Sequence, residues 1–258
     1  HWHDDHVNGN HAYREAWPDA KIISHRATLE ALQREWQKME DGRKTAYASI
    51  EAEQVYAAAD ELEDPFQAIG YRMYAGYIAA LKPELPTMEL VYPDTVFEES
   101  FVIDSGNRQV VVDWLGPGNT EGDVVVRLPD DDIVITGDLL VLPIPFAFDS
   151  PMTGWITTLE KLRNIDAGTI IPGHGPVQYN TDAIDRLIAL LTDTLDAVRD
   201  AHDSYLPYTR LSEKVDLGAH EALYTGGDAR HVFAWRSYFR DPGLRSAWAS
   251  LGYPVPEE

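Results

Sequence analysis

The first six residues, His1-Trp2-His3-Asp4-Asp5-His6, contain three imidazoles and two carboxylates within fewer than two helical turns. Imidazole nitrogen and carboxylate oxygen together suit zinc or iron, and such a donor set can leave a position open for water. His1 and His3 are separated by one residue, so an extended segment would point both side chains to the same side. This density of donors predicts a metal-binding site.

Three further segments carry polar residues where the pattern of a strand gives way to a tight turn. They are Gly118-Asn119-Thr120, Gly137-Asp138-Leu139 and Pro172-Gly173-His174-Gly175. Residues at strand ends are held by a rigid scaffold and can project into a common cleft. Because the chain has no cysteine, any metal must be held by nitrogen and oxygen. The four segments together predict one shared metal centre.

In their order and spacing these segments resemble the metallo-β-lactamase superfamily. Its hallmark HxHxDH corresponds here to His1, His3, Asp5 and His6. GPGNTEGDVVV resembles the second histidine loop of the family, VITGDLL its bridging-aspartate loop and IIPGHGPV its last histidine loop. The resemblance implies an α/β fold, the αββα four-layer sandwich. In the family an N-terminal run of strands precedes the hexapeptide, so we expect the first part of the sandwich to be missing from this chain.

The resemblance also implies the metal ligands. Six residues would hold one or two zinc ions: His1, His3, Asp5, His6, Asp138 and His174. Asp138 would bridge two sites, and Asp5, His6 and His174 would complete the second of them. Asn119 stands where the first site requires a third histidine, and its amide oxygen is a weaker zinc ligand than imidazole. Two interpretations stay open, a mononuclear enzyme using the second site and a dinuclear one with a loosely held first metal.

The resemblance implies metal-assisted hydrolysis, in which zinc lowers the pKa of bound water to about 7. Asp5 would orient the water, and Asn119 would either bind metal weakly or donate amide hydrogens to a developing oxyanion. We expect Trp2, Phe146 and Phe148 to contact substrate. The substrate would be a small-molecule ester, lactone, thioester or amide, with a β-lactam included. Two alternatives remain, an iron-dependent oxidoreductase of the same fold and a binding protein that has lost catalysis.

The charge of the chain limits the kinds of partner that it could bind. Its 43 acidic and 21 basic residues give a formal charge of -22, which repels nucleic acids and anionic membrane surfaces. No run of 18 apolar residues occurs, so we expect no membrane span and a soluble protein. The compartment stays open between the cytoplasm and, if a leader was removed, the periplasm or exterior. The oligomeric state stays open as well.

The hydrophobic periodicity predicts a helical block, a strand meander and a helical end. Helices are expected over residues 7–17, 29–39, 47–62, 66–81, 155–165 and 182–201. Strands are expected over residues 21–24, 100–104, 109–114, 123–128, 133–136 and 169–171, the middle four forming an antiparallel meander. This alternation predicts a single domain over residues 1–258. The motifs would lie within about residues 1–178 and a mainly helical extension beyond them.

Overall fold

A computed structural model describes residues 1–38, 44–104 and 106–255; Met39 of the second expected helix lies outside the described residues. The chain divides by its internal contacts into two compact units. The first unit contains His1, Ser24–Thr28 and Phe97–Glu258, and the second contains Trp2–Ile23 and Leu29–Val96. The expectation of a single domain stays a prediction.

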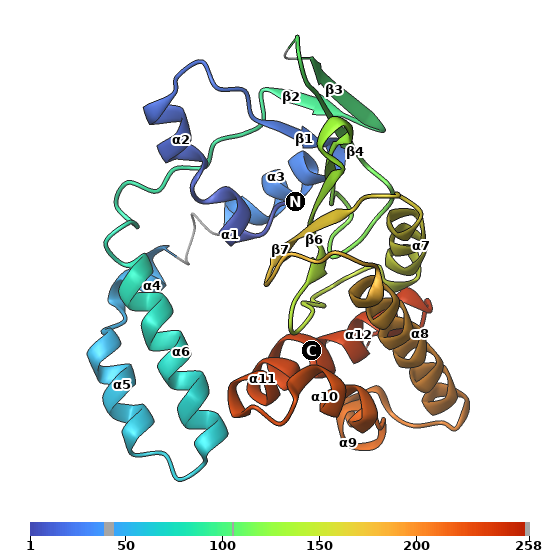
Figure 1. Cartoon of the computed structure of the whole chain (residues 1–258). Coiled ribbons are helices and arrows are strands. Elements are labelled where there is room, and N and C mark those ends of the chain that lie inside the picture. Colours follow the sequence, from blue (N-terminus) through green and yellow to red (C-terminus); the bar gives the residue numbers. More distant parts are fainter. Residues whose placement is uncertain (39–43, 105, 256–258) are drawn as a thin grey trace. The chain divides into compact units, whose positions relative to one another are not determined.

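The first unit is built on a five-stranded sheet of order β3-β4-β5-β6-β7 (Figure 1). Its strands are β3 (Ser100–Asp104), β4 (Gln109–Asp113), β5 (Val125–Leu128), β6 (Ile133–Val141) and β7 (Thr169–His174). The first four pair antiparallel, which confirms the expected meander, and β7 runs parallel to β6. Parallel neighbours bring the carboxyl-terminal ends of β6 and β7 to the same edge of the sheet.

Strand β6 is longer than its pattern predicts. It continues past Thr136 to Val141, although Gly137 has a left-handed φ of 51°. The register with β7 shifts on both sides of Gly137, so the strand absorbs the irregular residue and resumes pairing. Strand β5 is shorter than expected and begins at Val125, because Asp123 accepts hydrogen bonds from Thr120 within the preceding turn.

Two long helices form the core of the first unit together with the sheet. Helix α7 (Met152–Arg163) begins three residues before the expected Trp155, and α8 (Asp182–Asp203) runs two residues past its expected end. Trp155 is fully buried, and its indole Nε1 donates to the carbonyl of Leu139 at 3.2 Å. One core cluster runs through α7, α8, the sheet and the C-terminal helix α12 (Asp241–Ser250).

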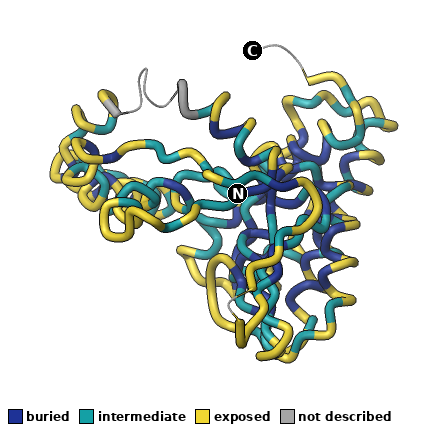
Figure 2. Tube along the Cα trace, turned by 90° about the horizontal axis from the view of Figure 1, so that it is seen from above, coloured by how far each residue is buried: buried dark blue, intermediate teal, exposed yellow. Residues whose placement is uncertain are grey.

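The end of the chain is helical, as the sequence predicts. After α8 come η3 (Tyr208–Arg210), α9 (Leu211–Lys214), α10 (Gly218–Thr225), α11 (Ala229–Ala234) and the π-helical turn η4 (Trp235–Arg240), followed by α12. Trp235 and Phe239 of η4 are fully buried in the same core cluster. Buried residues are dark blue in Figure 2. All the residues of this core cluster belong to the first unit.

The second unit is mainly helical. It contains α1 (Asp4–Val7), α2 (Asn10–Ala16), α3 (Arg26–Lys38, from Leu29 onward), α4 (Lys44–Ser49), α5 (Ala52–Asp60) and α6 (Pro65–Leu81). The prediction of one continuous helix over residues 7–17 is wrong, because Asn8 and Gly9 separate α1 from α2. Likewise Ile50 and Glu51 separate α4 from α5. Among the described residues, no helix has both the length and the apolar character needed to cross a bilayer.

A short two-stranded sheet pairs β1 (Ile23–His25) with β2 (Thr95–Phe97). Within the first unit the ring of His25 stacks on that of Trp114, with centroids 4.7 Å apart and planes 5° from parallel. Its Nε2 lies 3.0 Å from the carbonyl oxygen of Glu98, and its Nδ1 accepts from the backbone N–H of Ala27. These contacts give His25 a packing role.

Candidate metal centre

Asp138 lies on β6 beside the end of β7, and it is 3% exposed. Its Oδ1 is 3.6 Å from Nε2 of His174, the last residue of β7. Gly173 makes this approach possible, since a Cβ at that position would lie 2.0 Å from Asp138 Oδ1 and 2.7 Å from the carbonyl carbon of Gly137. The glycine of the PGHG segment is therefore required for the two strands to meet so closely.

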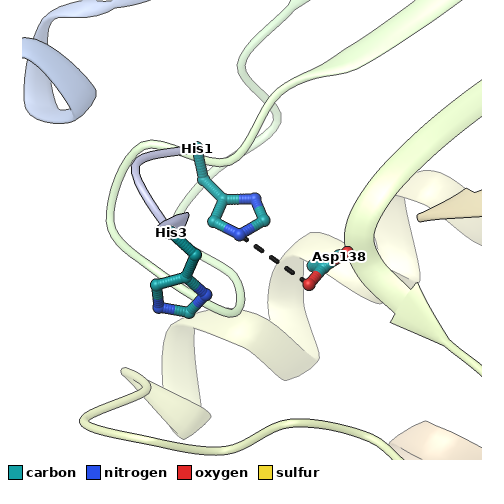
Figure 3. Close-up of side chains that lie close together, drawn as sticks. All are labelled: His1, His3 and Asp138. Atoms are coloured by element: carbon teal, nitrogen blue, oxygen red, sulfur yellow. Dashed lines mark ion pairs between the residues drawn. The ribbon is translucent and has the colours of Figure 1, made fainter. Parts of the chain in front are cut away.

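His1 belongs to the same unit and faces the other oxygen of the same carboxylate. Its Nε2 lies 3.7 Å from Asp138 Oδ2, the ion pair drawn as a dashed line in Figure 3. The side chain of His1 is 2% exposed. The Asp138 carboxylate thus has one imidazole nitrogen on each oxygen, His1 on Oδ2 and His174 on Oδ1. The His174 side chain is 48% exposed, so this side of the centre is open to solvent.

Asp123, which the sequence analysis did not single out, contacts the other nitrogen of His1. Its Oδ1 lies 3.3 Å from His1 Nδ1. Its Oδ2 accepts from the backbone N–H of Thr120 and, at 2.7 Å, from the Thr120 hydroxyl. Burial raises the pKa of the Asp123 carboxyl, and the hydrogen bonds from Thr120 oppose that change. The available signal in the sequence was an aspartate at the start of an expected strand, next to the segment Gly118-Asn119-Thr120 that was predicted to carry a ligand.

Asn119 is completely buried in the same loop. Its side-chain Nδ2 donates to the carbonyl of Phe146, and its backbone carbonyl accepts from the Ser150 hydroxyl at 2.8 Å. The side-chain Oδ1 has no hydrogen-bond partner among the described residues. Asn119 therefore ties the loop before β5 to the loop after β6 and keeps one buried acceptor atom unused.

Two of the three aromatic residues expected to contact substrate, Phe146 and Phe148, lie in that second loop. The rings of Phe146 and Phe148 have centroids 4.7 Å apart, and Phe146 lies 5.0 Å from the ring of Tyr238 on η4. Phe148 is 40% exposed. Since the backbone carbonyl of Phe146 is bonded to Asn119, the cluster is linked directly to the loop that carries Asp123.

The rest of the hexapeptide belongs to the second unit. His3 precedes α1 in a non-helical conformation, and its ring makes an edge contact with Trp2 at 4.8 Å. Asp5 and His6 both lie within the four-residue helix α1, with Asp5 Oδ2 3.5 Å from His6 Nε2. The segment is therefore extended at its start and helical from Asp4 onward. Its side chains therefore point in more directions than those of a single extended strand would.

Comparison with known proteins gives matches over much of the chain. A family model described as the metallo-beta-lactamase superfamily matches residues 1–174. The linear primary-alkylsulfatase of Pseudomonas sp. (strain ATCC 19151) is 26% identical over 151 residues, which cover 52% of this chain and 28% of that protein. The chain thus spans less than a third of the curated relative that it matches.

Two solved structures extend the comparison. A metallo-beta-lactamase family protein from Thermus thermophilus is similar at a TM-score of 0.54 and 14% identity, over 98% of this chain and 73% of that one. A metallo-beta-lactamase from Pontibacter korlensis is similar at a TM-score of 0.49 and 18% identity, over 74% of this chain and 66% of that one. At 14% identity, the likeness to the Thermus thermophilus protein concerns the fold alone.

Proposed function

Because the chain belongs to the metallo-β-lactamase superfamily, we propose that it is a zinc-dependent hydrolase of small-molecule esters, lactones, thioesters or amides. The α/β fold of this superfamily is of the hydrolase type. The observation that carries the proposal is the Asp138 carboxylate, which has an imidazole nitrogen beside each of its oxygens at 3.7 and 3.6 Å. A carboxylate in this position could share a metal ion with each of the two imidazoles.

The donors fit zinc in kind and in spacing. Two ligand atoms on one tetrahedral zinc ion lie about 3.3 Å apart, given bonds of about 2.0 Å. The two observed separations exceed that value by a few tenths of an ångström, so a small movement of either ring suffices. All donors in the site are nitrogen or oxygen, which suits zinc and leaves iron as the alternative.

We assign the ligands by combining this geometry with the family motif. The proposed ligands of one or two zinc ions are His1, His3, Asp5, His6, Asp138 and His174. Bound zinc would lower the pKa of a water ligand and polarise the bond to be cleaved. Asp5 would orient the attacking water as hydrogen-bond acceptor. Trp2, Phe146 and Phe148 would contact the apolar part of the substrate, and the exposed ring of Phe148 supports this.

The hydrogen bonds of Asn119 support a weak ligand role through Oδ1, while the second hydrogen of its Nδ2 keeps oxyanion binding as the alternative. Its Nδ2 already donates to the Phe146 carbonyl, whereas its Oδ1 is buried without a hydrogen bond among the described residues. An unsatisfied buried acceptor costs about 1–3 kcal/mol, and a metal ion would offset that cost. The proposed donors of the first site are His1, His3, the Asn119 amide oxygen and the shared Asp138 carboxylate, and the amide makes this site the weaker one.

The similarity to an alkylsulfatase directs the choice of substrate. That relative is named for linear primary alkyl sulfates, so a sulfate ester on an apolar chain is the first substrate to test. The aromatic cluster of Phe146, Phe148 and Tyr238 is a suitable surface for such a chain. An activated phenyl ester, a lactone and a chromogenic β-lactam would test the other members of the proposed class.

Metal content and turnover of the full chain test the proposal together. We expect zinc by mass spectrometry, hydrolysis of at least one of these substrates, and loss of both in Asp138→Asn. Asp130→Asn is the matched control, because Asp130 is an exposed carboxylate in the turn η2 (Pro129–Asp131). Asn119→His should raise zinc content or tighten its binding. Iron with sulfide-dependent oxygen uptake would favour the oxidoreductase, and a stable protein without metal would favour the binding protein.

A further inference from the structure

We infer that Asp123 is a positioning residue that fixes the ring orientation and tautomer of His1 for metal binding. The inference rests on the proposed function and adds a residue outside the proposed ligands. The two carboxylates on either side of the His1 ring have different surroundings. Asp138 is paired on its other oxygen with the half-exposed His174, whereas Asp123 is held inside its own loop and is 1% exposed.

The loop leaves Asp123 one oxygen for His1. Asp123 Oδ2 accepts both the backbone N–H and the hydroxyl of Thr120, so its hydrogen-bonding capacity is directed into the turn. Asp123 Oδ1 then faces His1 Nδ1 at 3.3 Å, close enough for a small turn of the ring to align a hydrogen bond that the present geometry does not form. The turn itself is anchored, since Thr28 donates to the carbonyl of Gly122 at 2.9 Å and Trp114 Nε1 donates to that of Glu121 at 3.0 Å.

In its ionised form the Asp123 carboxylate accepts hydrogen bonds and cannot donate them, so it favours the tautomer of a neutral His1 ring that carries the proton on Nδ1. That tautomer presents the lone pair of Nε2 toward Asp138 Oδ2, where the proposed metal would lie. Histidine ligands of metals commonly donate their second N–H to a carboxylate in this way. The effect matters more here than in a site with three histidines, because Asn119 replaces one imidazole.

An isosteric change distinguishes positioning from packing. In Asp123→Asn the single side-chain oxygen is retained by the two donors of Thr120, so the amide NH₂ faces His1 Nδ1. An N–H donor at that point favours the opposite tautomer, with the proton on Nε2 where the metal must bind. The side-chain volume hardly changes, so a purely structural role would leave the tautomer of His1 unaltered.

The experiment measures both the tautomer and the affinity for zinc in the full chain. Histidine ring nitrogens are labelled with ¹⁵N, and the His1 signals are read with and without zinc. Zinc affinity is measured by competition with a chromophoric chelator. We expect a protonated Nδ1 at His1 in the native protein, loss of that proton in Asp123→Asn, and about 10- to 100-fold weaker binding of zinc by the variant.

Matched variants guard against misfolding. Asp113→Asn removes another largely buried carboxylate, one that accepts from Ser100 and Arg127 on the sheet, and should leave the His1 signals and zinc affinity unchanged. Thr120→Val removes one hydrogen bond to Asp123 and should weaken zinc binding in the same direction by a smaller factor. If Asp123→Asn does not fold, the zinc affinity of Thr120→Val serves as the test of the inference.

The outcomes separate this inference from the proposed function. Native zinc affinity in Asp123→Asn, or in Thr120→Val if the first variant is unfolded, would overturn the inference. A protonated Nε2 at His1 in the native protein would do the same. If the native protein binds no metal, the proposed function fails, and positioning for metal fails with it. The tautomer shift would then report only a contact between Asp123 and His1.

Discussion

Replacing Gly173 with alanine tests whether the meeting of β6 and β7 shapes the proposed metal centre. An added Cβ would lie 2.0 Å from Asp138 Oδ1, 2.7 Å from the carbonyl carbon of Gly137 and 3.0 Å from the backbone nitrogen of Asp138. Real Cβ contacts essentially never fall below 3.0 Å, so Asp138 and the new side chain must separate by about 1 Å. Two of the three obstructing atoms belong to the backbone, so a side-chain rotation alone cannot relieve the clash.

The displacement should reduce activity more than stability. Moving Asp138 by about 1 Å changes its distances to both His1 and His174, and a misplacement of this size typically costs about 10²-fold in rate. Overpacking of this kind costs about 1–3 kcal/mol of folding free energy. We therefore expect a folded variant with about a hundredfold lower turnover and weaker zinc binding.

The assay combines turnover on the best substrate, zinc content and urea unfolding for Gly173→Ala and a control. Gly76→Ala is the control, because its Cβ would meet only the Tyr56 hydroxyl, at an ordinary 3.4 Å, in the middle of α6. It should keep native turnover and zinc content and gain about 1 kcal/mol of stability from better helix propensity. Native turnover and zinc content in Gly173→Ala would refute the argument that this close approach sets the position of Asp138.

Three other predictions concern the core, acid stability and the metal. Trp155→Ala removes a fully buried indole and should cost about 3–5 kcal/mol in urea unfolding; a cost below 1 kcal/mol would contradict its place in the core. Hydrogen bonds from the backbone N–H groups of His231 and Arg230 lower the pKa of Asp228, so its contribution to stability is present at neutral pH and lost as pH falls through that lowered value. Asp228→Asn should flatten this part of the Tm profile between about pH 5 and 2, and an unchanged profile would exclude the effect. Zinc at about a hundredfold excess over its Kd should raise the free energy of unfolding by about 2.7 kcal/mol, and a chelator should abolish this gain. A Tm that does not change with zinc concentration would contradict the prediction.

Local patterns in the sequence predicted much of the first unit. The alternation of apolar residues over 100–104 and 109–113 predicted β3 and β4, which pair as expected. The amphipathic pattern from Asp182 predicted α8 closely, because one face of that helix packs into the core. Helix breaks were less predictable, since Ile50 and Glu51 interrupt a continuous helical pattern without a glycine or proline.

The sequence by itself determined the donor chemistry, because the order of HxHxDH, TGD and PGHG is read directly from the chain. Tertiary structure alone decided which atoms meet. The pairing of β6 with β7 brings His174 to Asp138, and Gly173 permits the approach. Asp123 reaches His1 across more than a hundred residues of chain, and Asn119 reaches the carbonyl of Phe146 from a separate loop. Such contacts depend on how loops are held by the folded sheet, so no local spacing in the sequence encodes them.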